Sequence, residues 1–176
     1  MNSLLQSGRT KYISLSNSNL QTIQRFKKEF GDLFYAHEAH LSFEIRENQD
    51  KGIFYLCDDL GIQNVIWRPL RENKTVGYNW PLLVELSSKY GKTQNQIVLN
   101  WMAHRGYKIE VMSKSPEHIK ENWDATLFEM DDDDYQKMNE HRIDGYTYPK
   151  VDWNKTGEGI SVSVLPDKFE ENYVKP

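Results

Sequence analysis

The sequence predicts an α/β fold of about four parallel strand–helix units, which amounts to half of a (β/α)8 TIM barrel. Short runs rich in β-branched and aromatic residues alternate with longer segments of helical period. Their spacing is typical of βαβ units, which build parallel sheets. Because the common closed barrel holds eight such units, four leave two unpaired sheet edges and an exposed inner face. The organisation therefore predicts a missing partner half.

Glycines and capping residues mark the boundaries of the expected elements. In order, these are a helix over 1–7, a strand over 11–16, a helix over 19–30, a strand over 33–39, a helix over 47–60, a strand over 64–67, a polar loop over 71–78, helices over 79–91 and 93–106, a strand over 108–112, and helices opening at 115 and at 131–134. Residues 143–176 are rich enough in proline and glycine to predict an irregular C-terminal extension that packs on the barrel.

Three helix starts carry specific capping signals. Asn79 stands two residues before Pro81, and Ser115 stands directly before Pro116, so both are expected N-caps with proline in the first turn. Thr93 is followed three residues later by a glutamine, which is the pattern of a capping box.

Composition excludes several classes of protein. The formal net charge of −4 argues against a nucleic-acid binder, and no apolar run approaches the roughly 20 residues of a membrane span. The N-terminus lacks the pattern of a signal peptide. The one cysteine, Cys57, cannot form an internal disulfide and is expected to pack inside a helix. These features together predict a cytoplasmic protein.

The segment after the fourth strand is a candidate anion site. A helix N-terminus offers amides and a positive dipole, and Ser113, Lys114, Ser115 and His118 surround the expected one. The alternative is that Ser115 only caps the helix, which is the commoner use of serine at this position.

Other strand ends carry polar or aromatic groups with two possible uses. Ser16 and Asn17 suit a bound carboxamide or a simple capped turn. Trp67 suits stacking on a flat ring or packing in the core. Arg68 and Arg71 could pair with a bound phosphate or could simply be solvated. No metal site is expected, since the histidines lack ligand spacing and the acidic run at 131–134 is typical of a helix start.

Glu38 and His40 share one face of the second expected strand, where they could line a binding face or form a polar pair in a barrel interior.

Four blocks of sequence, in order, together resemble one known family. They are Lys11-Tyr12-Ile13-Ser14-Leu15-Ser16-Asn17; Trp67-Arg68-Pro69-Leu70; Tyr90-Gly91-Lys92-Thr93 with Gln96, Leu99 and Trp101; and Ser115-Pro116-Glu117-His118-Ile119-Lys120-Glu121-Asn122. They look like the conserved blocks of the aldo-keto reductases, over about residues 1–142. The resemblance implies strands five to eight of that family's barrel, its C-terminal half.

The resemblance also implies a nicotinamide cofactor, NADP or NAD, and the residues that hold it. Ser16 and Asn17 would bind the carboxamide, Trp67 would stack on the nicotinamide, and Glu38 would replace an amide that touches it. Leu70 and Arg71 would lie along the pyrophosphate. Ser113, Lys114, Ser115 and His118 would cover the adenosine phosphate, and Glu121 and Asn122 would contact adenine.

The family's catalytic Asp, Tyr, Lys and His come from strands that this chain lacks, so no catalytic residue is assigned. The expected function is therefore the cofactor-binding half of an NAD(P)-dependent oxidoreductase, inactive without its N-terminal half. The gene could be truncated or split, or the sequence a fragment. The alternative is a non-catalytic half-barrel that pairs with itself as a nucleotide-binding or scaffold protein.

Overall fold

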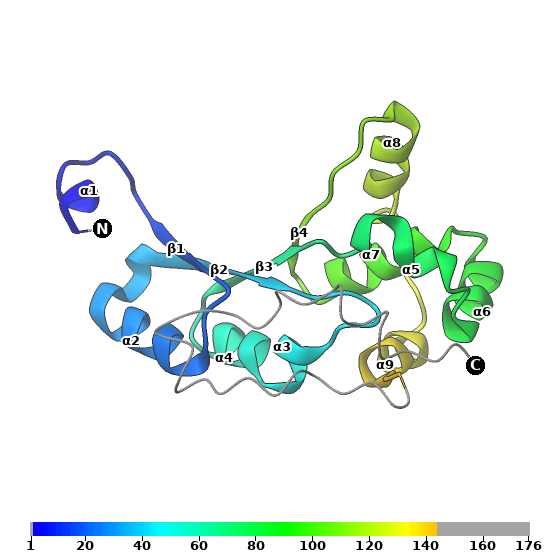
Figure 1. Cartoon of the computed structure of the whole chain (residues 1–176), viewed down its shortest axis with the longest axis horizontal. Coiled ribbons are helices and arrows are strands. Elements are labelled where there is room, and N and C mark those ends of the chain that lie inside the picture. Colours follow the sequence, from blue (N-terminus) through cyan, green and yellow to red (C-terminus); the bar gives the residue numbers. More distant parts are fainter. Residues whose placement is uncertain (1, 144–176) are drawn as a thin grey trace. The chain divides into compact units, whose positions relative to one another are not determined.

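The computed structural model describes residues 2–143, in which strands and helices alternate along the chain (Figure 1). The elements are α1 (Asn2–Gln6), β1 (Ile13–Ser16), α2 (Leu20–Phe30), the 3-10 turn η1 (Gly31–Leu33), β2 (Phe34–His40), α3 (Glu47–Asp50), α4 (Ile53–Asp59), β3 (Gln63–Trp67), the 3-10 turn η2 (Arg71–Asn73), α5 (Lys74–Gly77), α6 (Pro81–Tyr90), α7 (Gln94–His104), β4 (Lys108–Glu110), α8 (Pro116–Asp124) and α9 (Asp132–Glu140). The extension expected over 143–176 lies, after its first residue, outside the described residues.

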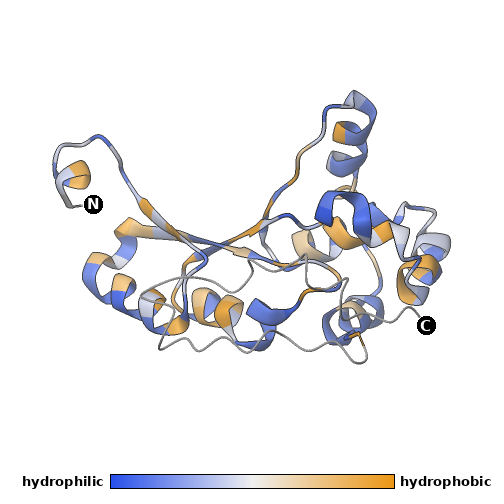
Figure 2. Cartoon of the chain, in the orientation of Figure 1, coloured by the Kyte–Doolittle hydropathy of each residue, from blue (hydrophilic) through white to orange (hydrophobic). Residues whose placement is uncertain are grey.

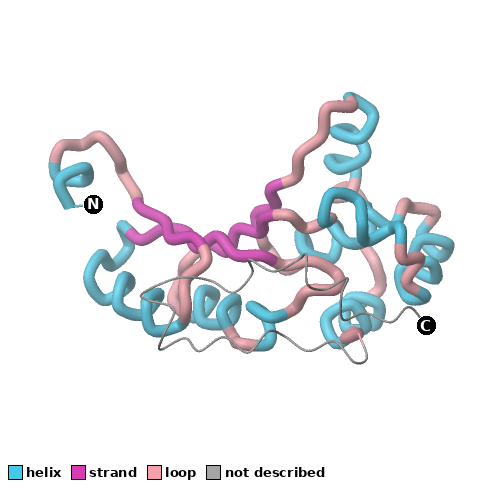
Figure 3. Tube along the Cα trace, viewed as in Figure 1, coloured by secondary structure: helices cyan, strands magenta, loops and turns pink. Residues whose placement is uncertain are grey.

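The four strands form one sheet in the order β1-β2-β3-β4 (Figure 3). Each strand neighbours the next one in the sequence, and a helical segment connects each pair, as in a series of βαβ units. β1 and β2 pair in parallel, with Ser16 opposite Glu38. The predicted α/β fold with parallel strands is confirmed.

The described residues group into two compact units. Residues 2–40 and 47–65 belong to the first unit, and residues 41–46 and 66–143 belong to the second. No helix among them is both long and apolar enough to cross a membrane.

The core of the first unit joins its strands to α2 and α4. Its buried side chains are Ile13, Ile23, Phe34, Ile53, Cys57 and Ile62. Cys57 of α4 thus serves in helix packing, as predicted. Figure 2 shows α2 with hydrophobic and hydrophilic residues both along its length, and Phe26 and Phe30 of this helix pack against the cluster. Asn19 is its N-cap, since the side chain accepts a hydrogen bond of 2.8 Å from the amide of Thr22.

The core of the second unit is built around α7. This helix begins with the predicted capping box of Thr93 and Gln96. Its buried side chains include Trp101, which is fully enclosed. The guanidinium of Arg46 lies 4.0 Å from the Trp101 ring and donates a hydrogen bond of 3.0 Å to the carbonyl of Met138. A buried cation therefore links segment 41–46 to α7 and α9.

The structure corrects two helical predictions. The single helix expected over 47–60 is two helices, α3 and α4, because Gly52 between them takes the left-handed φ of 78°. The loop expected over 71–78 contains the turn η2 and the short helix α5.

The prediction that Asn79 is an N-cap was wrong. α6 begins at Pro81, so the N-cap position belongs to Trp80, which makes no side-chain capping bond. Asn79 instead has a left-handed φ of 49°, a conformation that asparagine tolerates better than most residues. At the other end, Gly91 closes the helix in the left-handed conformation, as expected.

Candidate functional site

The second unit contains a pocket of about 910 Å³ at the carboxyl ends of β3 and β4. Its lining residues are Trp67, Arg68, Pro69, Leu70, Arg71, Glu72, Asn73, Val76, Thr93, Gln94, Asn95, Glu110, Val111, Met112, Ser113, His118, Glu121 and Asn122. They come from the loop after β3, the start of α7, the end of β4 and one side of α8. In α/β proteins, ligands bind at this end of parallel strands.

The loop after β3 forms one wall of the pocket and has an unusual backbone. Four of its non-glycine residues have left-handed φ values: Arg68 at 55°, Arg71 at 50°, Glu72 at 57° and Asn73 at 70°. Such conformations are unfavourable for residues with a Cβ, and they persist only where the surroundings fix them. This wall is therefore held in place by contacts elsewhere in the unit.

One buried carboxylate, that of Glu44, supplies contacts of this kind. Its Oε2 accepts a hydrogen bond of 3.0 Å from the Thr75 hydroxyl, and its Oε1 accepts one of 3.2 Å from the Trp80 indole. The guanidinium of Arg71 lies 3.6 Å from Oε1. Glu44 is 2% exposed and Arg71 is 1% exposed, so this ion pair is shielded from water.

Side-chain hydrogen bonds also connect the walls to one another. Asn95 at the start of α7 donates a bond of 2.8 Å to Asn73 of the loop. Thr93 donates to the carboxylate of Glu121 on α8, and Gln96 donates a bond of 3.1 Å to the Glu121 carbonyl. The loop, α7 and α8 are thus joined around the pocket.

The start of α8 has its own hydrogen-bonded arrangement. Ser115 is the N-cap: its hydroxyl oxygen accepts a bond of 3.2 Å from the amide of His118, and the hydroxyl donates one of 2.6 Å to Glu117. The bond from Ser115, together with the residue's own amide, lowers the pKa of Glu117. The capping interpretation of Ser115 is therefore confirmed. The hydroxyl of Ser113 accepts a bond of 3.1 Å from the amide of Ser115.

Two arginines, Arg68 and Arg71, are among the residues that line the pocket. Arg68 donates a hydrogen bond of 2.8 Å to Glu72, its neighbour in the same wall. Both arginines of the lining thus have carboxylate partners, Arg68 with Glu72 and Arg71 with Glu44. A ligand anion in this pocket would compete with or supplement these pairs.

Seven of the twelve residues predicted to bind a cofactor line this one pocket. They are Trp67, Leu70, Arg71, Ser113, His118, Glu121 and Asn122. Lys114 and Ser115 adjoin the pocket in sequence but are not among its lining residues. The other three belong to the first unit.

In the first unit, Ser16, Asn17 and Glu38 lie where β1 and β2 end. Asn17 has a left-handed φ of 53°, and its amide donates a hydrogen bond of 2.8 Å to the carbonyl of Glu38. The amide of Ser18 donates to Nε2 of the buried His37, at 3.1 Å. Burial lowers the pKa of His37 to about 4, so its neutral ring acts as the acceptor.

Sequence reasoning missed Glu44, Asn73 and Asn95. Glu44 lies 31 residues from Thr75 in the sequence, and nothing in its local pattern marks a buried carboxylate. Thr93 was expected as a capping residue and as part of a family block, but its hydrogen bond to Glu121 was not predicted. Residues 2–143 contain no cluster of three or more potential metal ligands.

Comparisons with known proteins give the family. The sequence pattern of the aldo/keto reductase family matches residues 1–143. The uncharacterized oxidoreductase YtbE of Bacillus subtilis is 30% identical over 176 residues, which cover 97% of this chain and 54% of YtbE. The NADPH-dependent alpha-keto amide reductase of Saccharomyces cerevisiae is 27% identical over 161 residues, 88% of this chain and 51% of that enzyme.

A solved structure supports the same fold. The crystal structure of a Gox0644 mutant in complex with NADPH superposes with a TM-score of 0.72 at 22% identity, over 88% of this chain and 55% of that one. The chain spans about half the length of the curated relatives YtbE and the yeast reductase. Since the family pattern covers most of its length, the chain belongs to the aldo/keto reductase family.

Proposed function

We propose that this chain forms the cofactor-binding half of an oxidoreductase that transfers hydride between NADH or NADPH and a carbonyl or alcohol. One observation carries the proposal: the pocket at the ends of β3 and β4 gathers seven residues that the family resemblance assigns to the cofactor. Its volume of about 910 Å³ lies in the range of pockets for small molecules and cofactors. The relatives' names, which include an NADPH-dependent reductase, agree with this ligand class.

The lining offers suitable groups for a dinucleotide. Trp67 provides an indole for stacking, and Leu70 and Arg71 lie on the strained wall, where the proposal places the pyrophosphate. Ser113 and His118 would contact the adenosine phosphate, with Lys114 and Ser115 beside them. Glu121 and Asn122 would contact adenine. The assignment of Ser16, Asn17 and Glu38 to the nicotinamide remains a prediction.

The cofactor, when bound, supplies the hydride, and the protein supplies binding and orientation. The proposal assigns no catalytic residue to this chain. The complementary four strand–helix units of a (β/α)8 barrel would bring the acid that protonates the substrate oxygen. On this proposal the chain by itself binds cofactor but does not turn over substrate.

A second candidate is a self-associating half-barrel without catalytic activity. It is favoured by the surface of α8, a helix in which no residue is buried. Ile119 is 55% exposed, Trp123 is 68% exposed, and nearby Leu127 is 67% exposed. Ile119 and Trp123 stand four residues apart on α8 and therefore share one face of the helix, which either a second copy or the complementary half would cover.

Binding of NADH and NADPH to the purified chain 1–176, followed by nicotinamide fluorescence, tests the proposal. We expect saturable binding that weakens several-fold in His118→Ala, because His118 lines the pocket. Lys120→Ala is the control, since Lys120 lies on the same helix outside the lining. A folded chain that binds neither cofactor would contradict the proposal. A discrete dimer in sedimentation without cofactor binding would support the second candidate.

A further inference from the structure

The wall of the pocket that follows β3 requires an external support. Residues 68–73 all line the pocket, and four of them have left-handed φ values. Each such conformation is disfavoured in isolation, so the loop would relax if nothing constrained it. The constraint must come from residues that contact the loop or its continuation into α5 and α6.

We propose that Glu44 is the positioning residue of this wall, and that it shapes the cofactor pocket without touching the ligand. The identity of the ligand in this inference rests on the proposed function, whereas the ordering of the loop by Glu44 does not depend on it. Glu44 lies in segment 41–46, which belongs to the second unit although the surrounding sequence belongs to the first. The segment is thus placed beside the loop by packing, not by chain continuity.

The contacts of Glu44 are distributed along the loop and its continuation. It pairs with Arg71 in the strained turn, with Thr75 in α5 and with Trp80 at the start of α6. Three donors spaced over ten residues thus converge on one carboxylate. A buried carboxylate held by several donors fixes their positions, since any displacement leaves polar groups unpaired.

Glu44 acts from outside the pocket. Neither Glu44, nor Thr75, nor Trp80 is among the lining residues, whereas Arg71 both lines the pocket and pairs with Glu44. A change at Glu44 therefore reaches the ligand through Arg71 and the backbone of the turn. This separation allows a positioning role to be tested without removing a ligand contact.

A matched pair of tryptophan variants provides the main test. Trp80→Phe removes the indole bond to Glu44, and Trp101→Phe removes the equivalent indole bond of 2.8 Å to Asn139 in the same unit. Both indoles are buried, and neither lines the pocket. We expect Trp80→Phe to raise the dissociation constant of NADH and of ADP-ribose about 5- to 10-fold, the effect of one hydrogen bond. Trp101→Phe keeps an aromatic ring under the guanidinium of Arg46 and thus keeps the link to segment 41–46, so it should lower the melting temperature but leave both constants within about twofold.

Hydrogen exchange of the ligand-free protein gives a second readout, independent of any ligand. Trp80→Phe should increase amide exchange in residues 68–79, and Trp101→Phe should not. If wild type binds neither NADH nor ADP-ribose, the proposed function fails, while this exchange experiment still decides the role of Glu44. Equal exchange in this loop for both variants would overturn the inference.

Substitutions of Glu44 itself test rescue by a conservative change. Glu44→Gln keeps groups that can bond Thr75 and Trp80 but weakens the pairing with Arg71, whereas Glu44→Leu removes all three. We expect intermediate loop exchange and affinity in Glu44→Gln and the largest loss in Glu44→Leu. Thr75→Val should resemble Trp80→Phe. Its control is Thr22→Val, a buried threonine in the first unit. If the dissociation constants of all variants simply follow their melting temperatures, Glu44 stabilises the fold in general and does not position the wall.

Discussion

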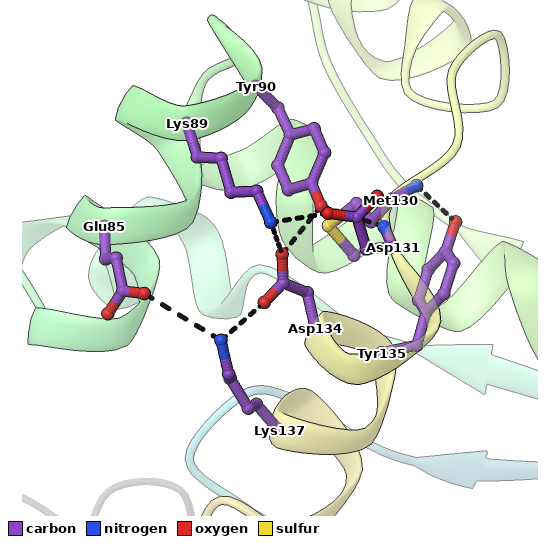
Figure 4. A network of polar contacts seen from close by, with 8 residues as sticks. All are labelled: Glu85, Lys89, Tyr90, Met130, Asp131, Asp134, Tyr135 and Lys137. Atoms are coloured by element: carbon purple, nitrogen blue, oxygen red, sulfur yellow. Dashed lines mark hydrogen bonds and ion pairs between the residues drawn. The ribbon is translucent and has the colours of Figure 1, made fainter.

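The ammonium nitrogen of Lys89 lies 2.7 Å from Oδ2 of Asp134, and this ion pair joins the last turn of α6 to the first turn of α9 (Figure 4). The Asp134 side chain is almost fully buried, and it also accepts bonds from Tyr90 at 2.6 Å and from Lys137 at 2.7 Å. Figure 4 shows these three donors pointing toward one carboxylate. Burial alone would raise the pKa of Asp134, but the bonds from Lys137, Lys89 and Tyr90 outweigh it and hold the pKa well below its usual range.

Asp134→Asn should therefore destabilise the second unit. Asparagine removes the charge that Lys89 and Lys137 pair with, but both lysines are about half exposed, so water screens the loss to roughly 1–2 kcal/mol. The free energy of unfolding from urea titration at pH 7 measures this. Asp133→Asn, an exposed change in the same first turn, should stay within about 0.5 kcal/mol. Equal effects of the two substitutions would show that the cluster contributes nothing specific.

The same cluster predicts a pH dependence of known sign. The pKa of Asp134 is lower in the folded chain than in the unfolded one. Its contribution to the free energy of unfolding is therefore complete at pH values above the unfolded pKa of about 4. It is lost as the pH falls through the lower, folded value. The difference in unfolding free energy between wild type and Asp134→Asn should thus shrink below about pH 4. A difference that stays constant from pH 7 to pH 3 would refute the assignment.

Burial of His37 predicts a loss of stability that begins at a higher pH than the loss expected from Asp134. Its pKa falls from the ordinary value of 6.5 to about 4 through burial, so the folded state disfavours the charged ring. The contribution of the neutral His37 ring to the free energy of unfolding is complete above about pH 6.5. It is lost progressively down to about pH 4, by roughly 3 kcal/mol in all. His37→Gln keeps an acceptor for the Ser18 amide but does not titrate. Urea titrations between pH 7 and pH 4 should show a shallower loss in this variant, whereas His118→Gln, at an exposed site, should follow wild type.

Local signals were enough to predict most of the fold. The capping box at Thr93, the N-cap at Ser115 and the left-handed glycine at Gly91 each depend on neighbours within four residues. Such rules read correctly from sequence because the competing interactions are local. They failed at Asn79, because the proline two residues later fixed the first helical position and moved the cap to Trp80.

The candidate site was only partly predictable, since its support is not local. The residues that follow β3 and β4 were found from their resemblance to the family's conserved blocks, and they lie around one pocket because parallel strands end at one edge. The burial of Glu44 beside Thr75 could not be found, since it depends on segment 41–46 packing against a loop 31 positions away. The left-handed conformations of the four residues in the wall could not be predicted either, because none of them is a glycine, the residue that usually marks such a conformation.

Two glycines allow backbone conformation to be separated from packing. Gly91 closes α6 with φ of 61°, whereas Gly77, the last residue of α5, does not have a left-handed φ. A Cβ added at either position would meet no atom within 4 Å, so any difference between the alanine variants is conformational. Gly91→Ala should lower the free energy of unfolding by about 1 kcal/mol, the usual cost of a left-handed alanine. Gly77→Ala should be neutral or slightly stabilising, because alanine favours helix and restricts the unfolded chain. Urea titration of both variants at pH 7 measures the two values side by side. Equal destabilisation by both would mean that the chain does not require the left-handed turn at Gly91.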